Sequence, residues 1–232
     1  VEKFKEKGIL PASTRYVYGD KFFRGELMSR VSDLDTLPSP YLTGIMDKFF
    51  DENLFITLQT SRGCPYSCTF CHDGDDYMRK TTRFSQERIN AEIDYMSERT
   101  KVEDLIIVDL NFGIFKQDME TAHKLAECQK KSGWPANIDS TTAKNHKVRV
   151  KEMSKVLSGT LHVGASVQST DEEVLKNIKR DNISLDQLMN VASDRVEDKS
   201  FAEIILCLPG DTKEKHLATA FQILNLGTKE IR

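Results

Sequence analysis

The amino-acid sequence predicts an α/β protein whose strands form a parallel sheet. From about residue 53 onward, short strand-like segments alternate with segments whose apolar residues recur every three or four positions. The links between these segments are short, and repeated β-α units of this kind build parallel sheets. A barrel closed by right-handed crossovers and an open doubly wound sheet share this local pattern, so both architectures stay open at this point.

The expected strands are short runs of apolar or alternating residues bounded by turn-forming residues. They cover residues 54–60, 105–108, 135–140, 160–167, 201–208 and 230–232. Apolar and polar residues alternate in the first of them, whereas the second is a continuous apolar run typical of a buried strand. The third has the weakest pattern.

The expected helices alternate with these strands. They start at Ser85 and cover about 116–131, about 148–157, 171–178 and about 211–226. Ser85 is suited to cap the first helix through its hydroxyl group. Thr170 with Glu173, and Asp211 with Glu214, have the spacing of a capping box, and we expect them to start the last two helices.

Three cysteines lie close together directly after the first expected strand. Cys64, Cys68 and Cys71 have the spacing Cys-x3-Cys-x2-Cys, and residues 61–63 break the strand before them. The sequence therefore places the three thiols on a loop at the C-terminal end of a strand. Clustered thiolates suit soft metals and iron–sulfur clusters. Three protein ligands leave the fourth iron of a [4Fe–4S] cluster free to bind a small molecule and pass it an electron.

The alternative for this loop is a zinc site that uses the same three cysteines and His72. Structural zinc sites usually combine two ligand pairs that are well separated in sequence, and no second pair exists here. Cys128 and Cys207 are isolated, and both are expected in the hydrophobic core. The five cysteines are too few for this length, and odd in number, for a disulfide framework.

The composition is ordinary for a globular protein with one sizeable core. The 232 residues are 39% hydrophobic and 30% charged, and the net charge of −3 gives no argument for nucleic-acid or membrane binding. No apolar stretch reaches the roughly twenty residues of a membrane span, and no signal peptide is visible. Reduced cysteines favour the cytoplasm. The sequence begins at Val1 without an initiator methionine, so we expect a fragment or a processed chain.

The cysteine loop resembles the signature of the radical S-adenosylmethionine (SAM) superfamily. The signature is Cys-x3-Cys-x-aromatic-Cys after the first barrel strand, and Phe70 supplies the aromatic residue. The resemblance implies that the three thiolates hold a [4Fe–4S] cluster and that SAM binds the open iron through its amino and carboxylate groups. Electron transfer, from a donor such as a flavodoxin or ferredoxin, then cleaves SAM to methionine and a 5′-deoxyadenosyl radical. The implied fold is a partial parallel (β/α)6 barrel, truncated at its C-terminus, with an N-terminal linker remnant.

The resemblance also assigns SAM-binding roles to residues near the strand ends. These residues are Phe70, Asp109, Asn111, Ser166, Gln168 and Arg180. Phe70 would lie against the adenine, although burial alone would explain an aromatic residue there. Asp109 and Asn111 stand where the superfamily often has a Gly-Gly-Glu motif that contacts the SAM amino group. They are equally well explained as turn formers at a strand end.

The later strand end offers three further candidates. Ser166 and Gln168 fall on the same side of an extended strand, which would turn both toward the barrel interior. Arg180 matches a basic residue that reaches the SAM carboxylate in the superfamily, and a guanidinium suits a carboxylate. The alternative for Arg180 is a charge that complements a helix C-terminus. For Ser169 and Thr170 we expect helix capping.

The first fifty residues differ from the remainder. Residues 33–41 resemble the connector that precedes the radical SAM domain in members with an N-terminal cobalamin-binding domain. We therefore expect residues 1–50 to be the end of such a domain plus a linker, and residues 51–232 to be an incomplete radical SAM core. A simple N-terminal extension is the alternative. The Asp-x-His-x-x-Gly motif that ligates cobalt is absent, so most of any cobalamin site would lie outside this chain.

The expected function is that of an enzyme that cleaves SAM to start radical chemistry on a small-molecule substrate, with cobalamin-dependent methyl transfer as one outcome. A cobalamin-independent enzyme, methylthiotransferase-like or cyclising, is the first alternative. A non-enzymatic iron–sulfur or zinc module is the second, and the series of β-α units with polar strand ends argues against it.

Overall fold

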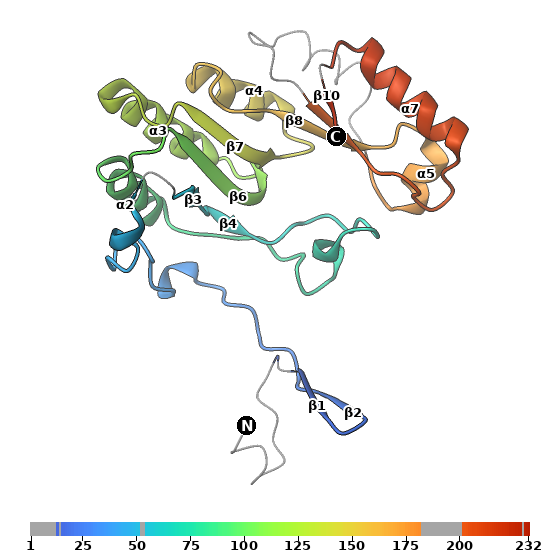
Figure 1. Ribbon diagram of the computed structural model, residues 1–232, viewed down its shortest axis with the longest axis horizontal. Helices are drawn as coiled ribbons and strands as arrows, with labels where there is room; N and C mark the ends of the chain where they lie inside the picture. Colours follow the sequence, from blue (N-terminus) through green and yellow to red (C-terminus); the bar gives the residue numbers. More distant parts are fainter. Residues whose placement is uncertain (1–12, 14, 52–53, 182–200, 229) are drawn as a thin grey trace. The chain divides into compact units, whose positions relative to one another are not determined.

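A computed structural model describes residue 13 and residues 15–51, 54–181, 201–228 and 230–232 (Figure 1). The chain divides into two compact units, Val1–Ser32 and Asp33–Arg232. In the first unit, β1 (Arg15–Tyr18) and β2 (Lys21–Arg24) form an antiparallel hairpin. Residues 1–12 of the expected linker remnant lie outside the described residues.

The second unit begins with a segment that packs into its core. Asp33 caps the short 3-10 helix η1 (Leu34–Thr36) by accepting a hydrogen bond from the Asp35 N–H at 3.1 Å. Leu34 is buried in the main hydrophobic core together with Tyr41. A second 3-10 helix, η2 (Asp47–Phe49), follows. Residues 33–50, which the sequence predicts to be part of the linker, thus belong to the second compact unit.

Six strands of the second unit run in two parallel three-stranded sheets. One sheet has the order β3 (Ile56–Leu58), β6 (Asp104–Phe112), β7 (Asn137–Thr142). The other has the order β10 (Glu230–Ile231), β9 (Phe201–Ile204), β8 (Gly164–Gln168). A single parallel bridge between Ile138 and Leu161 connects β7 to the segment before β8. The predicted parallel α/β architecture is therefore confirmed.

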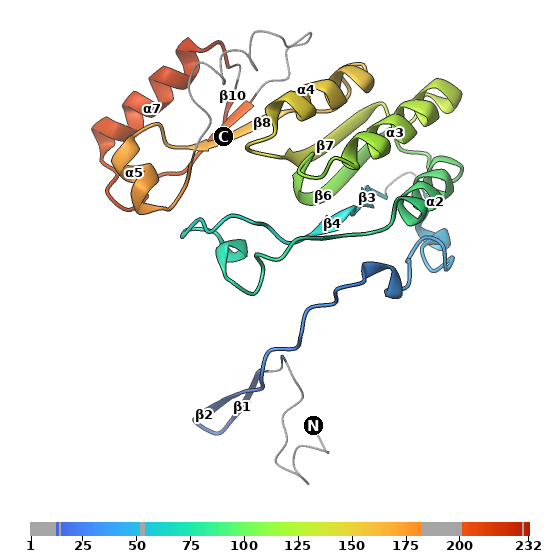
Figure 2. The same cartoon turned by 180° about the vertical axis from the view of Figure 1, so that it is seen from behind.

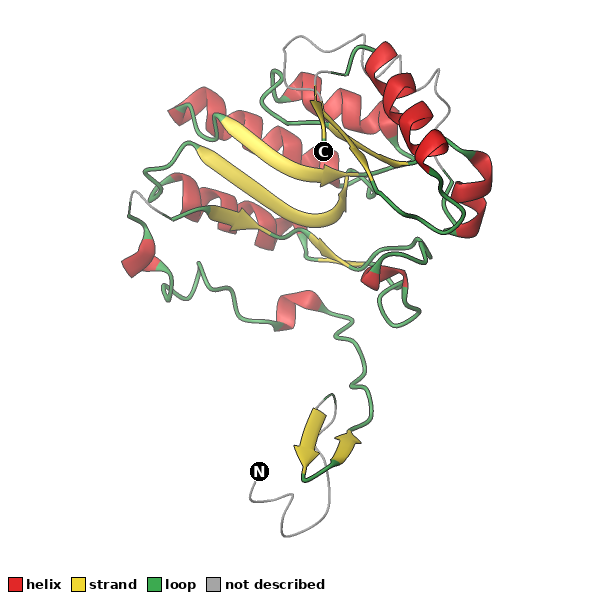
Figure 3. Cartoon of the chain, turned by 45° about the vertical axis from the view of Figure 1, so that its right-hand side comes forward, coloured by secondary structure: helices red, strands yellow, loops and turns green. Residues whose placement is uncertain are grey.

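Helices cover one side of each sheet (Figures 2 and 3). The helices are α2 (Gln86–Ser97), α3 (Asp118–Ser132), α4 (Lys147–Val156), α5 (Glu172–Asn177) and α7 (Lys213–Asn225). Alternate strand residues form the main core with α2, α3 and α4, as Ile107 is buried while its neighbour Val108 is exposed. Cys128 on α3 lies in this core, as predicted. No described helix has the length and apolarity needed to cross a bilayer.

Two predicted helix starts are wrong by one residue, while the predicted Ser85 cap is confirmed. Asp171, not Thr170, caps α5 and accepts a hydrogen bond from the Val174 N–H at 3.0 Å. The Thr170 hydroxyl is instead bonded to the Thr219 hydroxyl at 3.0 Å. Likewise Thr212, not Asp211, caps α7. In both cases the neighbouring residue also has a side chain that can cap a helix, so spacing alone did not select the right one.

The strand ends differ from the expectations at several positions. Asp109 lies inside β6, which continues to Phe112, so it does not form the turn. Asn111 is the first residue of that turn, because its carbonyl accepts a hydrogen bond from the Ile114 N–H at 3.0 Å, and Gly113, whose φ of 96° suits glycine, lies within it. Cys207 is not in the core, because β9 ends at Ile204 and the chain has turned outward there, leaving this cysteine exposed. Ser169 does not cap a helix either. Its hydroxyl accepts a hydrogen bond from the Asp171 N–H at 3.1 Å, just before α5 begins.

Candidate functional site: the cysteine loop and the strand ends

The three cysteines lie on a loop that is closed at its base by a short hairpin. Strands β4 (Ser61–Arg62) and β5 (Thr82–Arg83) pair antiparallel around residues 63–81. Cys64 and Cys68 are buried and Cys71 is exposed. The predicted break after the first strand therefore contains the short strand β4, which leads from β3 into the cysteine loop.

A tight turn joins the second and third cysteines to the 3-10 helix η3 (His72–Gly74). The Cys71 N–H donates to the Cys68 carbonyl at 3.1 Å, and the Gly74 N–H donates to the Cys71 carbonyl at 3.1 Å. A Cβ atom on Gly74 would lie 2.3 Å from the Cys68 carbonyl oxygen. Only glycine fits here, because the obstacle is backbone, and so the loop is shaped around its cysteines.

Two predicted cofactor-binding residues approach the buried thiols, one from the end of β6 and one from the segment after α5. The Asn111 side-chain amide on β6 donates to the Cys64 sulfur at 3.3 Å, and Asn111 is only 3% exposed. Arg180, which follows α5 and is 6% exposed, places Nη1 4.0 Å from the Cys68 sulfur. The Asn111 Oδ1 atom is buried without a hydrogen-bond partner. The structure thus offers polar groups directed at the thiols and an unused acceptor beside them.

Positive charge collects around the same loop. Burial, and after it the neighbouring Arg180 guanidinium, lower the pKa of Lys144, whereas the three cysteine thiols act to raise it. The Lys144 ammonium lies 5.1 Å from the centre of the Tyr66 ring. Burial also lowers the pKa of Arg180, although a guanidinium stays charged at neutral pH. Sequence reasoning missed Lys144, although it follows β7 by two residues and ligand-binding residues collect at such strand ends.

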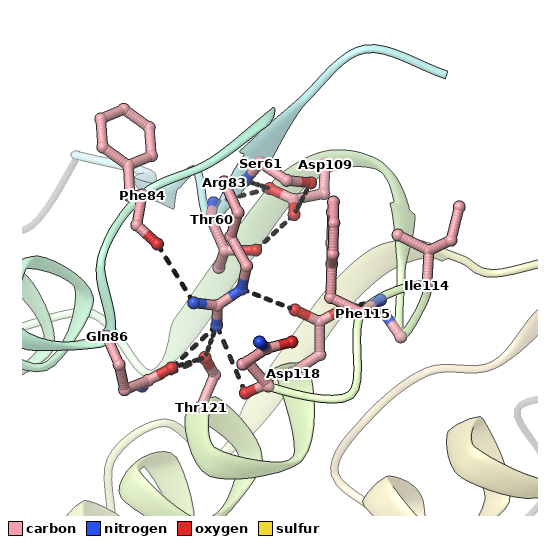
Figure 4. A network of polar contacts seen from close by, with 12 residues as sticks. Thr60, Ser61, Arg83, Phe84, Gln86, Asp109, Ile114, Phe115, Asp118 and Thr121 are labelled. Atoms are coloured by element: carbon pink, nitrogen blue, oxygen red, sulfur yellow. Dashed lines mark hydrogen bonds and ion pairs between the residues drawn. The ribbon is translucent and has the colours of Figure 1, made fainter. Parts of the chain in front are cut away.

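The Asp109 carboxylate faces the strand that leads into the cysteine loop (Figure 4). It accepts hydrogen bonds from the N–H and hydroxyl groups of Thr60, at 2.7 and 2.5 Å, and from those of Ser61, at 3.2 and 2.7 Å. Burial raises the pKa of Asp109, and these hydrogen bonds oppose the rise. Both oxygens of the carboxylate are therefore engaged within the protein.

The remaining predicted residues have different surroundings. The Ser166 hydroxyl donates to Glu203 Oε2 at 2.5 Å, and its carbonyl accepts a hydrogen bond from the Arg180 guanidinium. A register shift follows Ser166 in β8, and Gln168 has a φ of 62°, so the alternation that predicted a common side is interrupted. The buried Gln168 Oε1 atom has no partner. Phe70 is 37% exposed beside the last cysteine.

The donor set suits an iron–sulfur cluster in its chemistry. The loop supplies three thiols and is fixed by Gly74, and amide and guanidinium donors adjoin two of the sulfurs. Within the described ranges, no three His, Cys, Asp or Glu side chains are already gathered in a metal-binding arrangement. The ligation by Cys64, Cys68 and Cys71 therefore stays a prediction.

Known proteins resemble this chain in sequence. A curated relative from Streptomyces tokunonensis, the cobalamin-dependent radical SAM methyltransferase TokK, is 36% identical in an alignment of 220 positions that covers 89% of this chain and 32% of that protein. The 2-(S-pantetheinyl)-carbapenam-3-carboxylate methyltransferase of Streptantibioticus cattleyicolor is 34% identical over 92% of this chain and 33% of its own length. The chain thus spans about a third of these relatives.

Solved structures share the fold at low identity, and the family itself is matched in sequence. The radical SAM methyltransferase TsrM from Kitasatospora setae, with tryptophan and a SAM analogue, has a TM-score of 0.64 at 12% identity over 79% of this chain and 36% of that one. The cobalamin-dependent SAM radical enzyme OxsB has a TM-score of 0.58 at 18% identity over 91% and 31%. The profile of the Radical SAM superfamily matches residues 58–223. The chain therefore belongs to the radical SAM superfamily.

Proposed function

We propose that this chain holds a [4Fe–4S] cluster through Cys64, Cys68 and Cys71 and cleaves SAM reductively. The observation that carries the proposal is the meeting of a superfamily-matched cysteine loop with two donors, Asn111 at the end of β6 and Arg180 after α5. When bound, the cluster supplies one electron, which breaks a carbon–sulfur bond of SAM and yields methionine and the 5′-deoxyadenosyl radical. The protein's own residues hold and orient the two cofactors and exclude water.

Each candidate residue has a distinct part in this proposal. Arg180 binds the SAM carboxylate, because a guanidinium pairs with a carboxylate through charge-assisted hydrogen bonds. Asn111 keeps its amide on the Cys64 sulfur and offers its free Oδ1 atom to the SAM amino group. Ser166 and Gln168 line the polar side of the SAM site, and Phe70 lies near the adenine. Asp109 positions the loop rather than SAM, since its oxygens are already engaged.

The finer architecture is also part of the proposal. The two three-stranded sheets, joined at Ile138 and Leu161, form an incomplete (β/α)6 barrel that other parts of a longer protein complete. The chain's coverage of about a third of its relatives supports this view. We assign residues 1–50 to the end of an upstream cobalamin-binding domain and its linker, with some of these residues packing on the core.

The reaction that we propose for the complete protein is cobalamin-dependent methyl transfer to a small-molecule substrate in the cytoplasm, with a flavodoxin- or ferredoxin-type electron donor. Two curated relatives that match about nine tenths of this chain are methyltransferases, and the name of TokK states its cobalamin dependence. A cobalamin-independent radical SAM reaction is the second candidate.

Cobalamin binding separates the two candidates. We expect the complete gene product to bind hydroxocobalamin in equilibrium dialysis and residues 1–232 alone to bind it weakly or not at all, because this chain lacks the cobalt-ligating motif. Transfer of a labelled methyl group from SAM to a product would then support methyl transfer. Failure of the complete gene product to retain cobalamin would leave the cobalamin-independent reaction.

A further inference from the structure

We propose that Asp109 and Asp118 are positioning residues that clamp the two sides of the cysteine-loop base to the segment that runs from the end of β6 to the start of α3. The inference rests on the proposed cluster site, because its purpose is to fix the loop that carries the ligands. Both carboxylates come from the end of β6 and the start of α3, and both are buried. Figure 4 shows them facing opposite strands of the β4–β5 hairpin.

The first side of the clamp holds the chain where it enters the loop. Asp109 accepts four hydrogen bonds, two from Thr60 and two from Ser61. Ser61 is the first residue of β4 and precedes Cys64 by three residues. A carboxylate that accepts several N–H and O–H donors restrains them strongly, because hydrogen bonds to a charged acceptor are stronger than neutral ones.

The second side holds the chain where it leaves the loop. Arg83 Nε on β5 donates to Asp118 Oδ1 at 3.2 Å, with side chains only 10% and 1% exposed. The other guanidinium nitrogens donate to acceptors on three neighbouring segments, namely the Phe84 and Gln117 carbonyls and the side chains of Gln86 and Thr121. The Arg83 guanidinium is thus held in one orientation by several hydrogen bonds in addition to its ion pair.

The two sides act on residues that pair directly with each other. Ser61 is the β-sheet partner of Arg83, so the hairpin base is bound through both of its strands. Asp118 also accepts the N–H groups of Gly113 and Phe115, at 2.8 and 3.1 Å, and so fixes the turn that follows Asn111. The clamp therefore joins the cysteine loop to the strand whose asparagine amide reaches the Cys64 sulfur. Partners of metal ligands that are placed in this way set ligand orientation.

The chain contains a matched control for this device. Arg88 forms another largely buried ion pair with Glu92, at 2.7 Å and with side chains 14% and 10% exposed. Arg88 also donates to the Leu37 carbonyl at 3.2 Å, so its hydrogen bonds join α2 to the segment before β3. Toward the loop base it has a ring contact, with its guanidinium carbon 5.6 Å from the centre of the Phe84 ring. Arg83→Met and Arg88→Met therefore each remove a buried arginine, but only the first releases the loop base.

The test uses the complete gene product after anaerobic reconstitution, with an iron chelator as the probe. We expect Arg83→Met to speed loss of the cluster by about tenfold or more, and Arg88→Met to leave the rate within about twofold of wild type. Hydrogen exchange in the cluster-free protein gives a second readout. Amides of residues 63–81 should exchange faster in Arg83→Met alone, while α2 keeps its protection.

Equal rates of cluster loss and equal loop exchange in the two variants would overturn the clamp. If Arg83→Met does not fold, Arg83→Lys against Arg88→Lys gives the same comparison, because lysine keeps the charge and loses the planar fork. The clamp then predicts faster loop exchange in Arg83→Lys only. A wild-type protein that takes up no iron would contradict the proposed cluster site. The comparison of hydrogen exchange in the two variants would still test the clamp.

Discussion

Replacing Cys64, Cys68 and Cys71 together by alanine is expected to abolish the iron–sulfur absorption of the anaerobically reconstituted protein. The three side chains are the only cysteines that the loop contributes, and no other cysteine is close to them in sequence. Removing all three thiolates removes every proposed protein ligand of the cluster. The measurement is iron and sulfide content per chain together with the visible absorption spectrum.

Cys128→Ala is the control for this triple variant. Cys128 is buried in the core on α3, so its loss leaves a small cavity but no change at the loop. We expect this variant to keep its full complement of iron. Stoichiometric tetrahedral zinc without iron in the reconstituted wild-type protein would contradict the cluster and favour the zinc alternative that the same cysteines allow.

Arg180→Met is expected to weaken SAM binding by about 10- to 100-fold, the amount that corresponds to a charge-assisted hydrogen bond of about 1.5–3 kcal/mol. The guanidinium is buried and lies beside the Cys68 sulfur. In the variant, a SAM carboxylate bound at this buried, low-dielectric position would lack its cationic partner. The affinity can be measured by titrating the effect of SAM on the electron paramagnetic resonance spectrum of the reduced cluster.

The Lys179→Met variant distinguishes SAM binding by Arg180 from a simple charge effect at the C-terminus of α5. Lys179 is the adjacent basic residue after α5 and is exposed, so it shares any general effect on the helix C-terminus but not the position near the thiols. We expect its removal to leave SAM affinity unchanged. Equal weakening in the two variants would show that only the charge at the end of the helix matters.

Much of the fold could be predicted because local patterns fix it. Ile89, Ile93 and Met96 share one face of α2 and are buried as their spacing implies. The same kind of local pattern predicted the cysteine loop directly after the first strand. Such patterns failed where distant segments decide, as at Thr170, whose hydroxyl is bonded to Thr219 on α7 and not to its own helix. Tertiary contacts of this kind override capping preferences.

The candidate site was predictable only in part, for a related reason. The rule that ligands bind at the C-terminal ends of strands selected Asn111, which the structure brings to Cys64. Arg180, taken from the superfamily pattern, comes to Cys68. Neither consideration reveals that Arg83 meets Asp118, because these residues are 35 positions apart and each has an ordinary local explanation. Similarly, the bulge before Gln168 has no signature in its neighbours.

The electron paramagnetic resonance spectrum of the reduced complete protein, recorded with and without SAM, tests the central claim most directly. We expect one [4Fe–4S] cluster per chain, whose signal changes when SAM binds at the iron that lacks a protein thiolate, followed by release of 5′-deoxyadenosine. This measurement requires no knowledge of the substrate. A folded protein that carries the cluster, yet gives an identical spectrum with SAM and releases no 5′-deoxyadenosine, would contradict the claim.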